Sequence, residues 1–396
     1  MSEKKRILMI SDCAFYPQNE GNCRRIYNLI RSMYAAGYIV DFLYYASEKN
    51  RYTRQMKLFL GEGHFFFYRS PLIKISFFCR HSTGRPLERF VPPVRVDSRY
   101  LPELNKKVHE LVRKYKYDVV WLEYIYQSKL LESIDTSILK VIDTHDRFAY
   151  RNFNIFPVTH KMVNYSVTFC GERKALGRAD YVIAIQHDEE KYFRNLLKGK
   201  KTKVITIGDN HSIVKNEIQK NHDICFCGSS NGLNEDALNW FINDIFPMIV
   251  SEIKDCRLIV AGRICERMNI KMNKNVCLLG QVGDIDEVYK NCRIVINPVR
   301  VGTGLNIKSI EALAHCKPLV ATSVGARGLK WSEPIISIAD DELRFAQEVI
   351  HFLEDDSLCE KYRSNCIKFL EEYNRNNMNA IKKIMKCGAF RGEVEI

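Results

Sequence analysis

The sequence has no apolar run that approaches the roughly 20 residues needed by a membrane-spanning helix. Its N-terminus, MSEKKRILMISD, passes directly from charged residues into a candidate strand. Together these features predict a cytoplasmic protein with neither a signal peptide nor a membrane span.

The cysteines are numerous but not clustered. The 14 residues are scattered along the chain, and only Cys225 and Cys227 lie close together, where they alternate along an apparent strand. This distribution predicts reduced, buried or half-buried thiols, with no structural zinc and no disulfide framework.

Several motifs are also missing. The sequence contains no G-x-G-x-x-G, no RNA- or DNA-binding motif, no short internal repeat and no low-complexity segment. A dinucleotide-binding interpretation is therefore weak, although 396 residues are enough for two domains of ordinary size.

The net charge of +13 is confined to the first half of the chain. Residues 1–200 hold 34 lysines and arginines against 21 acidic residues, and the remainder holds 26 of each. Because no nucleic-acid motif accompanies this excess, an anionic membrane surface is the expected partner, and no nucleic acid is expected.

The segment from Arg51 to Arg99 is the most basic, with 10 cations against three acidic residues and many aromatics between them. Interleaved rings and cations are typical of a segment at a membrane interface. The alternative is a strand and a helix with aromatic core faces and a solvated cationic side.

Residues 292–330 contain the most informative pattern. Ile294 to Ile296 predict a short buried strand, Gly302-Thr303-Gly304 a loop, and Leu305 to His315 a helix that includes Asn306. Free backbone N–H groups and the helix dipole make such a helix N-terminus an anion site. Pro318 ends the helix before a second apolar strand.

Helical spacing places Gly304, Lys308, Glu311 and His315 on one stripe. A cation one turn inside the helix suits a phosphate, and a carboxylate one turn further accepts hydrogen bonds from ribose hydroxyls. The stripe therefore suggests a bound nucleoside diphosphate. The alternative is an ordinary strand–helix unit with a solvated Lys–Glu pair.

The N-terminal half resembles a Rossmann-type alternation of strands and helices, beginning with a strand from Arg6 to Ser11. In open α/β sheets, ligands bind outside the carboxyl ends of the strands. Glu123, His145 and Asp146 follow or end predicted strands, so they lie where chemistry could occur. Taken alone, a histidine in this place more often has a structural role.

The segment NPVRVGTGLNIKSIEALAHCKPLVATSVGARGL closely resembles the donor-binding segment of family 4 glycosyltransferases, within the group 1 glycosyltransferases. The resemblance implies an α/β protein of the retaining GT-B type, with two Rossmann-like parallel-sheet domains facing a cleft and C-terminal helices crossing back. Glu311 matches the second of two family glutamates, and Thr303 stands at the first, in a Gly-Thr-Gly form common to one branch.

The resemblance also implies a division of the chain. Residues 1–205 would form the acceptor domain, residues 206–375 the donor domain, and residues 376–396 a helix and tail that return to the first domain. Many family members carry an arginine and a lysine after the first strand of the donor domain. Here Ser229, Ser230 and Asn231 replace them, which shifts phosphate binding onto Lys308, Arg263 or Arg300.

Residue roles follow from the matched positions. The histidine of DTHD, His145, would approach the donor sugar, Lys308 would stabilise the diphosphate, and Glu311 would hold the ribose. The other implied donor-binding residues are Gly228, Ser229, Arg263, Gly302, Thr303, Gly304, Leu305 and Asn306. The implied acceptor-side residues are Gly21, Asn22, Arg24, Glu123 and Asp146.

The expected activity is retaining transfer of a hexosyl group (EC 2.4) from a nucleotide-diphosphate sugar to a saccharide acceptor. A lipid-linked acceptor in surface polysaccharide or glycolipid synthesis would fit the charge excess, with the protein peripheral on the inner face of a membrane. No metal or cofactor besides the donor is expected, and no general base is assigned. The alternatives are a GT-B nucleotide-sugar epimerase and a noncatalytic nucleotide-sugar-binding protein.

Overall fold

The computed structural model describes residues 4–18, 20–70, 93–153, 165–268, 274–302 and 304–389. These residues form two compact units. Unit 1 holds the described residues up to Phe153, those from 165 to Asn210 and those from Asn376 onward, and unit 2 holds His211 to Arg375. The sequence-based prediction placed the divisions after residues 205 and 375.

Unit 1 is built on a seven-stranded sheet with the strand order β3-β2-β1-β4-β5-β6-β7, in which neighbouring strands pair in parallel. The order reverses between β1 and β4, and this reversal makes the switch point where ligands bind in such sheets. The strands are β1 (Arg6–Ser11), β2 (Ile39–Ala46), β3 (Phe65–Arg69), β4 (Val119–Glu123), β5 (Leu139–Asp143), β6 (Tyr181–Ala184) and β7 (Lys203–Thr206).

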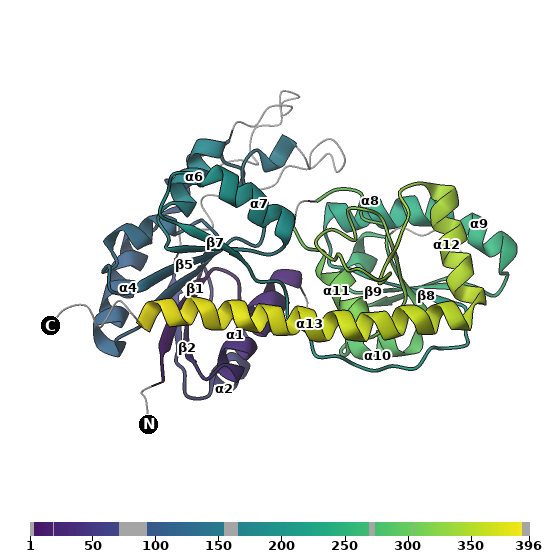
Figure 1. Ribbon diagram of the computed structural model, residues 1–396, viewed down its shortest axis with the longest axis horizontal. Helices are drawn as coiled ribbons and strands as arrows, with labels where there is room; N and C mark the ends of the chain where they lie inside the picture. Colours follow the sequence, from purple (N-terminus) through teal and green to yellow (C-terminus); the bar gives the residue numbers. More distant parts are fainter. Residues whose placement is uncertain are drawn as a thin grey trace. The chain divides into compact units, whose positions relative to one another are not determined.

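Helices cover both faces of this sheet (Figure 1). One core cluster joins the sheet to α1 and α2, and a second joins it to α4, α6 and α7. Helix α1 packs on the sheet through an apolar stripe at helical spacing, in which Ile26, Leu29, Ile30 and Met33 are all buried. The helices are α1 (Gly21–Ala35), α2 (Thr53–Leu60), α4 (Pro102–Tyr115), α6 (Phe169–Leu176) and α7 (His187–Leu196), with short 3-10 turns η1 (Val96–Arg99) and η2 (Ser128–Ser133).

The aromatic run in the first half of the predicted interfacial segment forms β3, at the edge of the sheet. Phe65 stacks near Phe42 of β2, with ring centroids 6.3 Å apart, and His64 and Phe66 pack against Tyr115. These rings therefore contribute to packing within unit 1. Residues 71–92 of the predicted interfacial segment lie outside the described residues.

Unit 2 has a six-stranded parallel sheet with the order β10-β9-β8-β11-β12-β13 and a switch point between β8 and β11. The strands are β8 (Asp223–Cys227), β9 (Arg257–Ala261), β10 (Val276–Gly280), β11 (Ile294–Asn297), β12 (Leu319–Ala321) and β13 (Ser337–Ile338). The helical elements are α8 (Gly232–Trp240), a π-helical turn η3 (Phe241–Ile245), α9 (Phe246–Glu252), the 3-10 turn η4 (Arg263–Arg267), α10 (Ile285–Asn291), α11 (Ile307–Ala314), α12 (Glu342–Glu354) and α13 (Asp356–Ala389).

Helix α8 begins at Gly232, within a polar stretch of the sequence. The reason is a cap: the Asn231 side chain accepts a hydrogen bond from the backbone N–H of Asn234 at 2.9 Å. The stretch GLNED is therefore the start of a helix, although its polar composition is typical of a loop.

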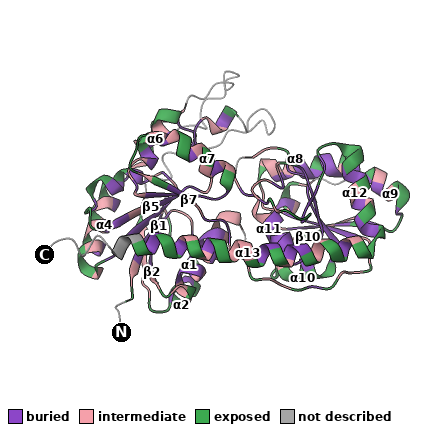
Figure 2. Ribbon diagram, in the orientation of Figure 1, coloured by how far each residue is buried: buried purple, intermediate pink, exposed green. Residues whose placement is uncertain are grey.

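Helix α13 belongs to both units, since it starts in unit 2 and its turns from Asn376 onward belong to unit 1. There Ile381, Ile384 and Met385 join the core cluster beside α1 and α2. Figure 2 shows that the strands are largely buried, whereas the helices carry exposed residues on their outer faces. No described helix combines the length and apolar character required to cross a membrane.

Candidate functional site

Two glycines bring the carboxyl ends of β8 and β9 into contact, next to the switch point between β8 and β11. Gly262 has φ 100°, and a Cβ on it would lie 2.3 Å from the carbonyl oxygen of Gly228. The same carbonyl accepts a hydrogen bond from the backbone N–H of Ile264 at 3.1 Å. A side chain at residue 262 would push these strand ends apart, so glycine fixes the position of the loop that follows β8.

That loop is tied to helix α8. The Asn234 amide donates to the Ser229 carbonyl at 2.9 Å, and Asn234 is 5% exposed. Its side-chain oxygen accepts a hydrogen bond from the ammonium of Lys308. Because Asn234 follows β8 and Lys308 follows β11, this hydrogen bond spans the switch point between the two strands.

Lys308 lies in the first turn of α11, and its ammonium sits 4.5 Å from the centroid of the Phe226 ring. Burial lowers the pKa of this lysine from 10.5 to about 8. Its hydrogen-bond partner is an uncharged amide, and the charge of the nearby Glu311 carboxylate opposes the effect of burial on its pKa. The site therefore holds a desolvated cation that a bound anion would stabilise.

Glu311 lies one turn further along α11 and is 9% exposed. Its carboxylate accepts a hydrogen bond from the Tyr289 hydroxyl at 3.1 Å. Tyr289 in turn stacks on His315, with ring centroids 4.6 Å apart. This packing fixes the Glu311 carboxylate and gives His315 a structural contact, although the sequence pattern had placed His315 on the ligand stripe.

The loop before α11 is partly described. Gly302 has φ 153°, and its carbonyl accepts a hydrogen bond from Arg327. Leu305 is buried, and the Asn306 amide donates to the Val324 carbonyl at 2.9 Å. Thr303 lies outside the described residues. These contacts hold the N-terminus of α11 in place beside Lys308.

The two arginines considered for the phosphate have other contacts. Arg300 pairs with Asp236 at 2.8 Å and lies over the Trp240 ring. The Arg263 side chain is 40% exposed, and its Nε lies 3.9 Å from Glu266. Of these three cations, Lys308 is the one placed at the N-terminus of α11.

In unit 1, His145 and Glu123 meet at the carboxyl ends of neighbouring strands. His145 Nε2 lies 2.5 Å from a Glu123 carboxylate oxygen, and the other oxygen accepts from the Trp121 indole N–H at 2.9 Å. Asp143 lies 3.6 Å from the same histidine nitrogen and is held by two hydrogen bonds from Arg25, at 2.9 and 2.8 Å. All five side chains belong to one buried network.

Burial raises the pKa of Glu123, the neighbouring Asp143 raises it further, and the hydrogen bond with His145 opposes both. Within the described residues, Glu123, Asp143 and His145 also have ligand atoms within 4.8 Å of one another, close enough to hold a metal ion. Their oxygens, however, already accept hydrogen bonds from His145, Trp121 and Arg25, which makes this a self-paired network. The absence of a metal requirement stays a prediction.

The backbone around this network is strained. His145 and Tyr124 have φ values of 58° and 66°, in the left-handed region, and their rings stack with centroids 4.2 Å apart. Such residues cost about 1–3 kcal/mol each and cluster at functional sites. The strained backbone supports a functional role for the residues that follow the carboxyl ends of β4 and β5.

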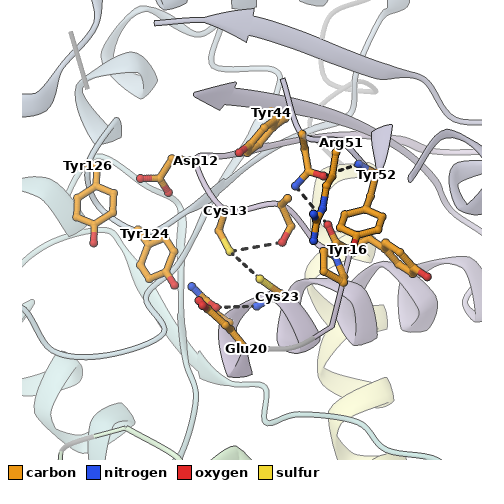
Figure 3. A pocket seen from close by; sticks show the side chains of 14 residues that line it. Asp12, Cys13, Tyr16, Glu20, Cys23, Tyr44, Arg51, Tyr52, Tyr124 and Tyr126 are labelled. Atoms are coloured by element: carbon orange, nitrogen blue, oxygen red, sulfur yellow. Dashed lines mark hydrogen bonds between the residues drawn. The ribbon is translucent and has the colours of Figure 1, made fainter. Parts of the chain in front are cut away.

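A cavity of about 560 Å³ lies beside this network, at the switch point between β1 and β4 (Figure 3). Asp12 directly follows β1, and Tyr124 directly follows β4. The cavity is also lined by Tyr16, Tyr44, Tyr52, Tyr126, Glu20 and Arg51, together with small and amide side chains.

The predicted acceptor-side residues are dispersed around this cavity. Asn22 lines it, and Gly21 is the first residue of α1. Arg24 donates to the Gln18 carbonyl at 3.2 Å, Asp146 pairs with Arg151 at 2.7 Å, and Glu123 lies beneath His145.

Sequence reasoning missed Asp12 and the tyrosines of the cavity. Asp12 follows the first strand, so the rule applied to Glu123 and His145, that ligands bind beyond strand ends, would also have identified it.

Comparisons with known proteins agree with this architecture. Residues 221–355 match the family described as "Glycosyl transferases group 1". An uncharacterized 44.6 kDa protein in the cps region of Klebsiella pneumoniae is 23% identical over 405 residues, which cover 96% of this chain and 99% of that protein.

Two solved structures have the same fold. Sucrose-phosphate synthase from Thermosynechococcus elongatus has a TM-score of 0.68 at 16% identity, over 98% of this chain and 100% of that chain. A variant of TarM from S. aureus, in complex with fondaparinux, α-GlcNAc-glycerol and UDP, has a TM-score of 0.67 at 11% identity, over 96% of this chain and 99% of that chain. The chain is thus a GT-B protein, and its residues 221–355 match the group 1 glycosyltransferases.

Proposed function

We propose that this protein is a retaining family 4 glycosyltransferase that moves a hexosyl group from a nucleotide-diphosphate sugar to a saccharide acceptor. The observation that carries the proposal is the Lys308 ammonium, which is desolvated beside Phe226 and Asn234 at the N-terminus of α11. A nucleoside diphosphate supplies the anion that such a site lacks.

The reaction would use these groups to stabilise the leaving diphosphate. When the sugar–oxygen bond breaks, negative charge develops on the β-phosphate. The backbone N–H groups at the start of α11 and the Lys308 ammonium are preorganised to receive that charge. Removing one preorganised donor of this kind raises a barrier by about 2.7–4 kcal/mol, or roughly 100- to 1000-fold in rate.

The remaining donor contacts follow from Glu311 and His145. The Glu311 carboxylate, fixed by the Tyr289 hydroxyl, is an acceptor for the two ribose hydroxyls. His145, fixed by Glu123 and Tyr124, would contact the donor sugar.

We further propose a cytoplasmic protein that acts on a lipid-linked acceptor at a membrane surface, in the synthesis of a surface polysaccharide. The +13 excess in residues 1–200 supports the membrane contact. The Klebsiella pneumoniae relative from a cps region supports the polysaccharide setting.

The test is a thermal-shift panel of UDP, GDP, ADP, CMP and dTDP on the wild type, Lys308→Ala and the control Lys290→Ala. Lys290 is an exposed lysine of the same unit, 3.4 Å from Glu287. A ligand at 100 times its Kd adds about 2.7 kcal/mol of stability. One diphosphate should stabilise the wild type and the control, with most of the effect lost in Lys308→Ala. If no diphosphate stabilises the wild type, the donor site is refuted.

A further inference from the structure

The tyrosine-lined cavity of unit 1 has a chemistry different from the basic half of the chain that contains it. We propose that this cavity binds the acceptor through a sugar ring that carries no anionic group, with Asp12 accepting hydrogen bonds from the ring's hydroxyls. This inference rests on the proposed transferase function and specifies its acceptor. Any phosphate of the acceptor then lies outside the cavity.

The walls of the cavity suit a sugar. Tyr124 and Tyr126 stack with ring centroids 5.2 Å apart, and Tyr126 is braced edge-on by Tyr165 at 4.8 Å. On another side Tyr16 and Tyr52 pack against each other at 5.5 Å. Tyrosine rings offer an apolar face for the C–H groups of a sugar and a polar edge for its hydroxyls.

The tyrosine hydroxyls remain uncharged donors. Burial raises the pKa of Tyr44 to about 12, and burial also raises the pKa values of Tyr124 and Tyr126. The hydrogen bond with Cys23, followed by burial, raises the pKa of the Cys13 thiol in the same lining. None of these groups adds charge at neutral pH.

The charged groups of the lining are two carboxyls, Asp12 and Glu20, and one cation, Arg51. A second guanidinium, that of Arg99, lies 5.0 Å from the centroid of the Tyr126 ring. The Arg51 guanidinium lies 4.8 Å from the centroid of the Tyr52 ring. Figure 3 shows Asp12 among the rings of Tyr44, Tyr124 and Tyr126. A phosphate or carboxylate placed beside Asp12 would meet a like charge, which is unfavourable in a partly desolvated space.

Asp12 is suited to accept hydrogen bonds. Burial raises the pKa of this carboxyl to about 6, against the opposing effect of the nearby Arg99 and His145. At neutral pH it is therefore mainly ionised, and an ionised carboxylate only accepts hydrogen bonds. Hydroxyl groups supply the matching donors.

A group of six cations lies elsewhere in the described part of unit 1. A second cavity, of about 620 Å³, lies at the turn between α7 and β7, at the amino end of that edge strand. Its charged lining residues are Arg194, Lys198, Lys200, Lys201, Lys203 and Lys383. The tyrosine-lined cavity adjoins the carboxyl ends of β1 and β4. The acidic cavity and the basic cavity therefore lie at opposite ends of the parallel strands.

The experiment measures Kd by NMR titration for neutral sugars and their anionic counterparts. The neutral probes are the methyl glycosides of glucose, galactose and N-acetylglucosamine, and the anionic probes are methyl glucuronide and methyl glucoside 6-phosphate. At least one neutral glycoside should bind about tenfold more tightly than both anionic probes. Asp12→Asn should weaken that binding by about five- to tenfold, because a charged acceptor is replaced by a neutral amide.

Glu103→Gln is the matched control, since Glu103 is a 65% exposed carboxylate on α4 and its removal makes the same charge change. It should leave every Kd unchanged. The proposal is overturned if an anionic probe binds as tightly as the neutral ones, if no neutral glycoside binds at about 100 mM, or if Asp12→Asn leaves the neutral affinity unchanged.

The nucleoside diphosphate thermal shift keeps the two proposals separate. It reports on unit 2, so Asp12→Asn should retain it if the variant is folded. Failure of every diphosphate to stabilise the wild type would refute the donor site. The sugar titrations test sugar binding in the cavity of unit 1 independently of that result.

Discussion

Replacing Lys308 by methionine should make the protein more stable at neutral pH while abolishing transfer. Burial destabilises the charged form of this lysine in the folded state and lowers its pKa from 10.5 to about 8. That shift corresponds to roughly 3 kcal/mol against the charged form, at 1.36 kcal/mol per pKa unit. Methionine has a similar length and no charge, so the substitution removes the unfavourable burial of a charge. It also removes the hydrogen bond to Asn234.

The pH dependence isolates the lysine from other effects. Below pH 8 the folded and unfolded states both bind the proton, and the whole cost is present. Between pH 8 and 10.5 the unfolded state binds more protons, so the unfolding free energy of the wild type rises with pH relative to the variant. From pH 7 to pH 10 the difference between the two proteins should change by about 2–3 kcal/mol in favour of the wild type.

Urea unfolding at pH 7 and pH 10, followed by intrinsic fluorescence, measures this difference. Lys290→Met removes the same charge from the surface of unit 2 and is the control. A difference between wild type and Lys308→Met that is the same at both pH values, or that changes in the opposite direction, would refute a desolvated ammonium at the donor site.

Three further predictions address the other groups. Glu123→Gln keeps a hydrogen bond to His145 but removes the negative charge, so kcat should fall about 10- to 100-fold. The thermal shift produced by the nucleoside diphosphate should be retained. An unchanged kcat would contradict the positioning role of Glu123. The nucleoside diphosphate that stabilises the wild type should bind about tenfold more tightly than its 2′,3′-dideoxy form in calorimetric titrations, and Glu311→Gln should reduce this preference. Equal preference in both proteins would argue against a ribose contact. Vesicles containing anionic lipid should retain the protein at low salt in a flotation assay. The double variant Lys200→Glu and Lys201→Glu should weaken this retention. No retention of the wild type would refute the membrane contact.

Local patterns were enough to predict the strands and the helix of the donor segment. The predicted strand at Ile294 to Ile296 is β11, and the predicted helix from Leu305 to His315 contains α11. Both signals are local, because an apolar run, a breaking proline and a glycine loop act within a few residues.

Contacts between distant residues could not be predicted in the same way. The start of α8 depends on the Asn231 cap, which a polar composition concealed. The position of Lys308 depends on Asn234 and Phe226, which lie more than 70 residues earlier in the chain. The cavity at Asp12 requires the β1–β4 switch point, and the pairing of those strands appears only in the folded sheet.

In the proposed reaction, a sugar leaves a nucleoside diphosphate and joins an acceptor. The most direct measurement incubates the protein with radiolabelled nucleotide-diphosphate sugars and a membrane fraction, and counts released diphosphate against transferred sugar. A transferase should give equal amounts of released diphosphate and transferred sugar for one donor, and Lys308→Ala should lower both roughly 100- to 1000-fold. Isomerised donor without diphosphate release would identify an epimerase, and donor binding without turnover would identify a noncatalytic protein; either result would contradict the proposed reaction.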